Sequence, residues 1–212
     1  KRVNMDFRMI KHSRTPHLEG SRLQQGGENP FQIPFEEIAG RHLIIEDEID
    51  GVIRLFPLTI KAARRKHYLM GGYREKHYAL LKQGAGVPRD ALWNVLGFRY
   101  ILYGEWIYVK HSIYYDCLPH YFIEFDVLNR KAQILGHLFK AELLANLPVA
   151  HVPVLRNGML LDKAELLSPI GIFCYISDRH IENFRETSAV EAGLYIKVEE
   201  NGEVAKRVKF VC

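Results

Sequence analysis

The sequence has few cysteines and no long hydrophobic run. Three cysteines, Cys117, Cys174 and Cys212, are spread over 212 residues and form no CxxC pair. Their number and spacing exclude a disulfide framework and a zinc knuckle, and predict buried thiols in a reducing compartment. No run of about 18 apolar residues is present, and the N-terminal residues lack the apolar core of a secretory signal. We therefore expect a cytoplasmic protein with no membrane partner.

Common catalytic and metal-binding motifs are also missing. The chain contains no HExxH, P-loop, GxGxxG or GxSxG pattern. His111 and His120 do not have the spacing of metal ligands, so structural histidines are the simpler interpretation. The sequence by itself indicates no metal site.

The composition is that of a folded domain with a basic region. With 48% hydrophobic and 25% charged residues, the chain can bury the core of one domain, which we expect to span 1–212 with a loop-rich segment at 1–40. The formal charge is only +4. Between Lys61 and Lys76, however, six cations alternate with Tyr68 and Tyr73. Cations among flat rings suit the phosphates and bases of a nucleic acid, although an ordinary solvated surface has the same pattern.

Helical and strand patterns alternate irregularly along the chain. Helical spacing predicts helices over 74–82, 89–96, 131–147 with Pro148 just past its end, and 162–171, and a helical turn over 35–40. Aromatic and β-branched residues predict strands over 98–112 and 121–129. Asp50-Gly51 and Asn201-Gly202 are dipeptides that favour hairpin turns, and each lies between two predicted strands. The predicted class is therefore α+β with mainly antiparallel sheets.

Ordered sequence blocks cover almost the whole chain: HLEGSR, EDEIDG, RKHYLMGGYREKHYALLK, YILYGEWIYVKHSIYYDCLPHYFIEFDVLNR and EAGLYIKVEENGEVAKRVKFV. Their order and spacing resemble the ATP-dependent RNA ligases of the covalent nucleotidyltransferase superfamily. The resemblance implies a nucleotidyltransferase core of two mainly antiparallel sheets with flanking helices and a nucleotide cleft between them. It also implies ATP and Mg²⁺ as cofactors and RNA as substrate.

The first catalytic position departs from that family. Its members read K-x-D-G, whereas this chain reads Glu48-Ile49-Asp50-Gly51. The family's lysine attacks the α-phosphate of ATP and carries AMP as a phosphoramidate, a stable bond that a carboxylate cannot form. The substitution also reverses the charge beside the triphosphate, and each charge unit is worth about 4 kcal/mol at ~4 Å with an effective dielectric constant near 20. We expect weaker ATP binding as well as lost chemistry, whether the change is natural or engineered.

A second catalytic position departs as well. The family usually reads E-G-L, with a glutamate that organises a divalent metal, whereas this chain reads Ala192-Gly193-Leu194. Glu191 stands one residue early, and a single step along a strand turns a side chain to the opposite face. Glu191 is therefore not expected to replace the missing carboxylate.

Other family positions are retained. The resemblance implies that Glu105 accepts a hydrogen bond from a ribose hydroxyl and that Phe122 stacks on adenine. It also implies that Lys209 belongs to the closing basic motif, which neutralises the phosphates. The alternatives are a solvent-facing glutamate, a core phenylalanine and an exposed hairpin lysine. The full nucleotide-binding set is Asp50, Gly51, Arg65, Glu105, Phe122, Lys197 and Lys209, and the RNA-binding set is Arg64, Arg65, Lys66, Arg74, Lys206 and Arg207.

The sequence leaves three functional hypotheses. The leading one is an RNA-ligase-like protein with an ATP- and RNA-binding cleft that has lost or impaired lysine adenylation and binds RNA or a protein partner. The second is an active ATP-dependent RNA ligase for RNA end joining and repair, represented here with altered catalytic residues. The third is an interaction protein that binds no nucleotide.

Overall fold

The computed structural model describes residues 14–22, 31–49, 53–55, 63–64, 67–68, 76, 89–108, 113–171, 174–181 and 193–212. The helices are η1 (Phe35–Glu37), α2 (Arg89–Leu96), α3 (His137–Leu144) and α4 (Lys163–Leu167). The first strands are β1 (His17–Leu18), β2 (Gln32–Ile33), β3 (His42–Asp47), β4 (Ile53–Leu55), β5 (Ala63–Arg64) and β6 (His67–Tyr68). The later strands are β7 (Tyr100–Trp106), β8 (Phe122–Asn129), β9 (Ile134–Leu135), β10 (Ala150–His151), β11 (Val154–Met159), β12 (Gly193–Glu200) and β13 (Glu203–Val211).

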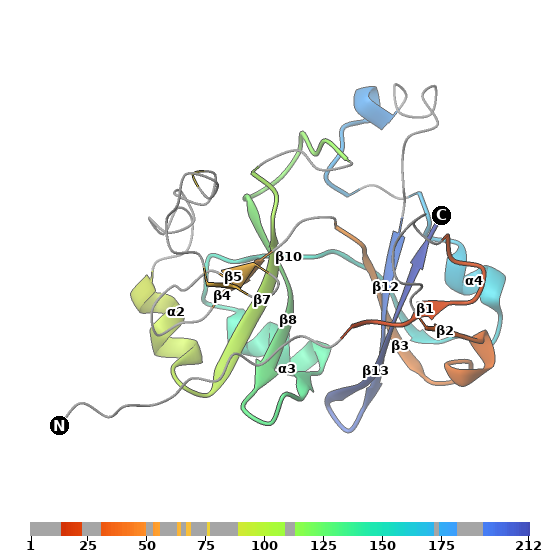
Figure 1. Ribbon diagram of the computed structural model, residues 1–212, viewed down its shortest axis with the longest axis horizontal. Helices are drawn as coiled ribbons and strands as arrows, with labels where there is room; N and C mark the ends of the chain where they lie inside the picture. The colour runs from red at the N-terminus through yellow and green to blue at the C-terminus, as the bar shows by residue number, and fades with distance from the viewer. Residues whose placement is uncertain are drawn as a thin grey trace.

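The described strands are linked in one sheet with two halves. The first half contains β11-β3-β12-β13 and the second contains β8-β7-β4-β5-β6. The short strand β9 joins them, because it pairs with β13 on one side and with β8 on the other. Figure 1 shows the two halves facing each other across the molecule. The α+β class with mainly antiparallel pairing is confirmed, and the two predicted sheets are the two halves of one strand path.

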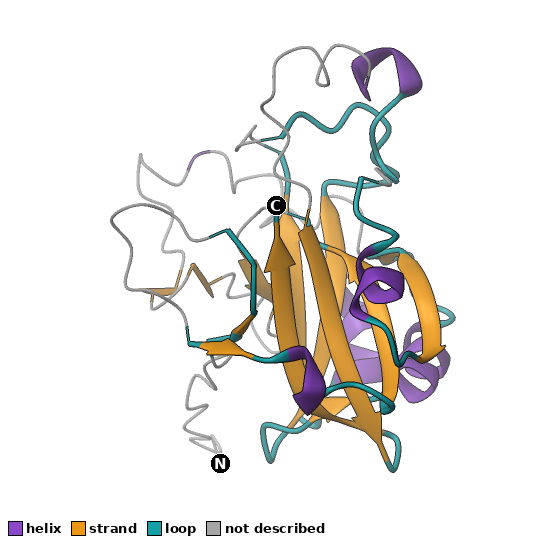
Figure 2. Ribbon diagram, turned by 90° about the vertical axis from the view of Figure 1, so that its right-hand side faces the viewer, coloured by secondary structure: helices purple, strands orange, loops and turns teal. Residues whose placement is uncertain are grey.

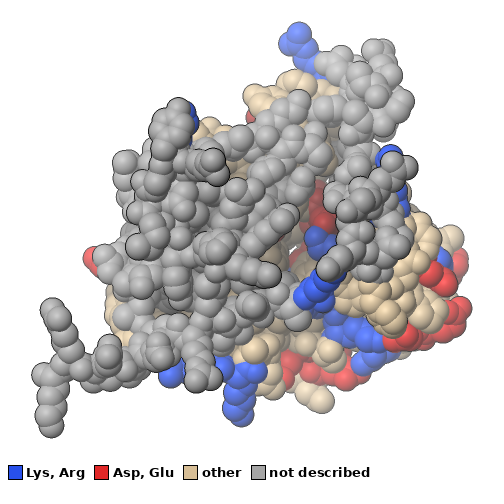
Figure 3. Space-filling view, viewed as in Figure 1, with Lys and Arg blue, Asp and Glu red and all other residues tan. Residues whose placement is uncertain are grey.

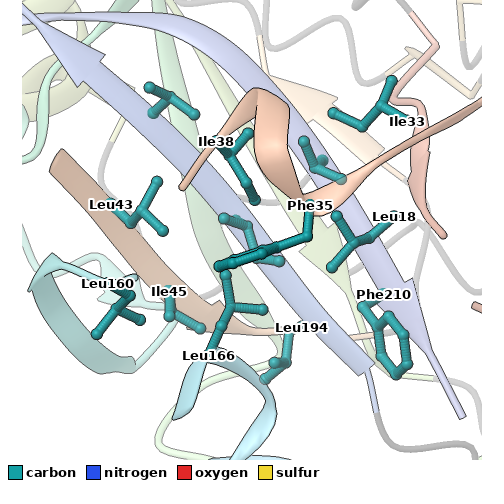
Figure 4. Close-up of a cluster of buried hydrophobic side chains, with 13 residues drawn as sticks. Leu18, Ile33, Phe35, Ile38, Leu43, Ile45, Leu160, Leu166, Leu194 and Phe210 are labelled. Atoms are coloured by element: carbon teal, nitrogen blue, oxygen red, sulfur yellow. The ribbon is translucent and has the colours of Figure 1, made fainter. Parts of the chain in front are cut away.

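The first half buries one face under η1 and α4. Alternation along the strands brings Leu43 and Ile45 of β3 to the same side as Leu194 of β12 and Phe210 of β13. Figure 2 shows η1 and α4 lying across this face, and Figure 4 shows their side chains within the cluster. The opposite face, which we call the inner face, points toward β8 of the second half.

The second half has its own core. Leu92 and Leu96 of α2 pack against Leu102 and Trp106 of β7. Further members from β8, β9, α3 and the segment after it are Phe122, Val127, Leu135, Leu144, Leu147 and Val149. The predicted helix over 89–96 is confirmed. The helix predicted over 131–147 is shorter, because Ile134 and Leu135 are used for sheet pairing before α3 begins.

One predicted hairpin is correct and the other is wrong. β12 and β13 turn at Asn201 and Gly202, whose φ angles of 53° and 78° are those of a tight hairpin turn. The strands on either side of Asp50-Gly51 do not pair with each other. β3 instead pairs with β11 and β12, and β4 pairs with β7 and β5. Five of the six β3 residues are buried, so both faces of this strand are covered, while β11 and β12 pair with its two edges.

Two smaller expectations are also corrected. Strict alternation along β8 fails because Tyr103 pairs with Asp126 and Gly104 with Glu124, which leaves Phe125 as an extra residue in a bulge. The three cysteines were expected to be buried, but all are exposed free thiols. Over the described residues, no helix has the length and apolar character that a membrane crossing requires.

Candidate functional site

Glu48 directly follows β3 and lies beside Gly193, the first residue of β12. Its backbone N–H donates to the carbonyl of Gly193 at 3.1 Å. A Cβ atom built on Gly193 would lie only 2.9 Å from the Cβ of Glu48, closer than side-chain carbons normally approach. Glycine at position 193 therefore makes room for the Glu48 side chain on the inner face.

The Glu48 carboxylate forms a direct ion pair with the ammonium of Lys209 in β13. The two side chains are 19% and 34% exposed, so the pair is partly shielded from water. One negative and one positive group here neutralise each other. A lysine at position 48 would instead have placed two cations together.

His17 is a third member of this group and had no predicted role. Its strand β1 pairs in parallel with β13, and His17 stands opposite Lys209. Its Nδ1 atom lies 3.0 Å from the hydroxyl of Ser21. Burial lowers the pKa of His17, Glu48 opposes that change, and Lys209 adds to it. The HLEGSR block was the only sequence signal for this residue, and it carried no chemical assignment.

Lys197 of β12 is held in a buried ion cluster that connects the two halves. Its Nζ atom lies 2.7 Å from Glu46 Oε2 and 2.9 Å from Asp126 Oδ1, and it donates to the carbonyl of Phe125 at 2.6 Å. Burial alone would lower the pKa of Lys197, but Asp126 and Glu46 raise it above its usual value, so the amine stays charged. The contact with the Phe125 carbonyl is a hydrogen bond, whereas the contacts with Glu46 and Asp126 are ion pairs.

The cluster extends to further charged groups on both sides. Lys140 of α3 lies 3.2 Å from Glu124 and 3.5 Å from Glu46. Burial alone would raise the pKa of Glu124, but Lys140 and a contact with His151 at 2.9 Å hold it below its usual value.

Tyr195 and Arg207 complete the cluster around Asp126. The Tyr195 hydroxyl donates to Asp126 at 2.8 Å and accepts from Arg207 at 3.2 Å. Three carboxylates, Glu46, Glu124 and Asp126, are thus matched by three cations, Lys140, Lys197 and Arg207. The cluster is balanced in charge.

Asp47, next to Glu48, carries a strongly shifted carboxyl group. Burial raises its pKa from 3.8 to about 6, a backbone N–H from Cys174 opposes the shift, and Glu48 adds to it. Asp47 is 9% exposed. A buried carboxyl beside a second carboxylate is costly to ionise, so Asp47 titrates in a range where other aspartates are already charged.

The retained nucleotide-binding candidates lie at different depths. Glu105 is half-buried on β7 and faces away from Trp106 by strand alternation. Phe122 is fully buried in the core of the second half, where its ring packs against Gly104. Stacking of Phe122 on adenine stays a prediction, and the ring would have to leave this core to do so. A phosphate contact by Lys197 would likewise require its ion cluster to rearrange.

The RNA-binding candidates are only partly covered by the described residues. Lys206 forms an ion pair with Glu37 on the outer side of β13, whereas Arg207 joins the inner cluster. Arg64 lies in β5, described for its backbone alone. Asp50, Gly51, Arg65, Lys66, Arg74 and Ala192 lie outside the described residues. On the face in Figure 3, described basic and acidic side chains lie side by side and do not form one basic surface.

A pocket of about 550 Å³ opens between the N-terminal segment and the β12–β13 hairpin. It is lined by Arg14, Lys206 and Arg207 on the basic side and by Glu200 and Glu203 on the acidic side. Glu48 and Lys209 do not line it. In the described part of the chain, no group of three or more His, Cys, Asp or Glu side chains is arranged to hold a metal ion.

Comparison with known proteins identifies the family of this chain. A sequence model of the RNA ligase family matches residues 11–211. Two solved structures of an archaeal ATP-dependent RNA ligase, forms 1 and 2, share the fold with TM-scores of 0.57 and 0.56 at 16% and 15% identity. Each match covers 84% of this chain but 44% of the archaeal chain, so this chain spans less than half of that length. A search of curated proteins found no match.

Proposed function

Because this chain belongs to the RNA ligase family, we propose that it keeps an RNA-ligase-like binding site but is impaired in attaching AMP to itself. In this proposal the protein binds RNA in the cytoplasm, alone or with a protein partner. It binds ATP and Mg²⁺ weakly or not at all. The observation that carries the proposal is the ion pair between Glu48 and Lys209.

The first argument is chemical. Holding AMP on the protein requires a nucleophile that forms a lasting bond to the α-phosphorus, and a neutral amine meets that requirement. A Glu48 carboxylate would give a labile acyl phosphate, and in this structure its oxygen is already engaged by Lys209. Glu48 therefore supplies no lasting carrier for AMP.

The second argument is electrostatic. The triphosphate of ATP is strongly anionic. A positive charge ~4 Å from one of its negative charges attracts it by about 4 kcal/mol at an effective dielectric constant near 20, before screening by salt. The Glu48–Lys209 pair offers no surplus positive charge. Lys197 and Arg207 are matched by the carboxylates of Glu46 and Asp126. The described inner face is therefore poorly suited to a triphosphate.

Restoring the family residues tests this proposal. Glu48→Lys combined with Ala192→Glu should recover a covalent AMP adduct when incubated with radiolabelled ATP and magnesium, because the amine and the carboxylate are both supplied. The matched control is Glu48→Gln with Ala192→Glu, which removes the acid without adding a nucleophile and should stay unlabelled. Equal labelling of both variants would contradict the role assigned to position 48.

The alternative function is an active RNA ligase with altered catalytic residues. It is favoured by the retention of Lys209 on the inner face and of the ordered cluster around Lys197. The unmodified chain would then join a 5′-phosphate RNA end to a 3′-hydroxyl end in the presence of ATP. Formation of a sealed RNA product by the unmodified chain would favour this alternative over impaired adenylation.

A further inference from the structure

An exposed group of aromatic rings stands at the end of β7, outside the charged site. Tyr108 is 44% exposed and Tyr121 is 46% exposed, whereas Trp106 beneath them is 2% exposed. The Tyr108 and Tyr121 ring centroids are 5.2 Å apart, with the rings nearly perpendicular at 85°. We call these three residues the aromatic platform.

The platform is held in place by packing and by the backbone. The Trp106 and Tyr108 rings lie 25° from parallel with centroids 6.0 Å apart, so one face of Tyr108 is turned toward Trp106. The backbone N–H of Ile107 donates to the carbonyl of Tyr121 at 2.8 Å, which fixes the two segments side by side. Because these rings are already ordered, a flat ligand that stacks on them loses little further side-chain entropy.

We infer that the aromatic platform stacks a nucleobase of single-stranded RNA on the open side of Tyr108, with Tyr121 as the side wall. This inference rests on the RNA binding in the proposed function. The ligand is identified by chemistry: a purine or pyrimidine ring matches the flat face of Tyr108, and such stacking tolerates any base.

The platform lies at the same end of the sheet as Glu48, but its rings point to the opposite face of β7, because Trp106 packs in the core with α2. Ile49, next to Glu48, and Ile107, next to Trp106 and Tyr108, pack in one cluster with Ile123. Ile107 thus marks the end of the sheet that Glu48 and the platform share, and an RNA strand would reach both by passing around the end of β7.

β4 and β5 extend the sheet beyond β7. β4 pairs with β7, and β5 pairs with β4, so Arg64 in β5 stands two strands, or about 10 Å, from β7. The sequence from Lys61 to Lys76 that contains β5 and β6 carries six cations. The sequence therefore carries, beside its stacking rings, the cations that single-strand binding also requires.

The experiment measures binding of a fluorescent oligouridylate to the full chain at several salt concentrations. Tyr108→Ala and Tyr121→Ala should each weaken binding between about fivefold and about a hundredfold, because stacking on one base is worth about 1–3 kcal/mol. Tyr108→Phe keeps the ring and should bind like the unmodified chain. The slope of log K against log salt should stay the same in all of these variants, because no phosphate contact is lost.

Two matched controls separate stacking from other effects. Phe139 is also 44% exposed but lies on α3, so Phe139→Ala should leave RNA binding unchanged. An abasic oligonucleotide of equal charge should bind Tyr108→Ala and the unmodified chain equally well. Thermal unfolding checks that each variant is folded. If Tyr108→Ala does not fold, Tyr121→Ala still tests the platform.

Each other outcome has a defined meaning. Unchanged oligouridylate binding by folded Tyr108→Ala and Tyr121→Ala would overturn the platform while leaving salt-dependent RNA binding intact. A loss in Tyr108→Phe equal to that in Tyr108→Ala would assign the contact to the hydroxyl and overturn stacking. If the unmodified chain binds no RNA at any salt concentration, the proposed function fails first, and a protein partner becomes the occupant to seek.

Discussion

Glu48 and Lys209, which are 161 residues apart in sequence, form an ion pair where β3 ends and β13 passes beside it. The contact joins Glu48, which we propose stands in place of the family's lysine, to Lys209 of the predicted closing basic motif. In this proposal the carboxylate does more than take the place of a nucleophile, since it also gives Lys209 an internal anion. An internal carboxylate competes with any phosphate for that ammonium.

A double-mutant cycle on Glu48 and Lys209 should reveal a small favourable coupling. Glu48→Gln, Lys209→Met and the double variant should give a coupling of up to about 1 kcal/mol in urea unfolding, because the partly exposed pair is screened by water. The coupling should shrink at high salt. Additive effects of the two single changes would contradict a stabilising pair.

The buried amine of Lys197 should matter much more to stability. Lys197→Met leaves Glu46 and Asp126 without their nearest cation, and breaking a buried pair in this way costs about 3–5 kcal/mol. Lys131→Met, at an exposed turn position after β8, is the matched control and should change the free energy of unfolding little. Equal urea midpoints for the two variants would show that the cluster around Lys197 is not formed.

The stability of the protein should depend on pH through Asp47. Its pKa is raised from 3.8 to about 6, so the folded state holds a proton that the unfolded state has released between these values. Stability therefore falls as pH rises from about 4 to about 6, and the penalty persists above that range. Asp47→Asn should raise the melting temperature at pH 7.5 and flatten the profile between pH 4 and pH 6. A variant less stable than the parent at pH 7.5 would contradict this account.

Gly193 should not tolerate a larger residue while Glu48 is present. The added methyl of Gly193→Ala would lie 2.9 Å from Glu48 Cβ, and relieving such overpacking costs about 1–3 kcal/mol. Glu48→Ala keeps the Cβ but removes the carboxylate, so it should restore part of the lost stability. Thermal unfolding of the single and double variants measures this, and a Gly193→Ala protein as stable as the parent would show that the two side chains are not packed together.

The sequence predicted the class and several elements because their signals are local. Asn201-Gly202 specifies its own turn, and helical spacing over 89–96 is enough to place α2. The pairing around Asp50-Gly51 was wrong because strand partners depend on contacts between distant segments. β3 is buried on both faces and lies between β11 and β12, which no local pattern predicts.

The identity of the site residues stays a prediction, and the sequence did not predict their contacts. The motif order identified Glu48 and Lys209 as members of one site, whereas their mutual ion pair depends on the register of β12 against β3 and β13. His17 was missed as a neighbour because β1 reaches Lys209 through a parallel pairing of only one residue. The full burial of Phe122 likewise depends on helices that pack against β7 and β8.

The most direct test is intact-mass spectrometry of the unmodified chain, both as purified and after incubation with ATP and magnesium. We expect the mass of the bare polypeptide in both samples, because the residue at position 48 is an acid already paired with Lys209. A mass increase of one adenylyl group on any side chain would contradict the account.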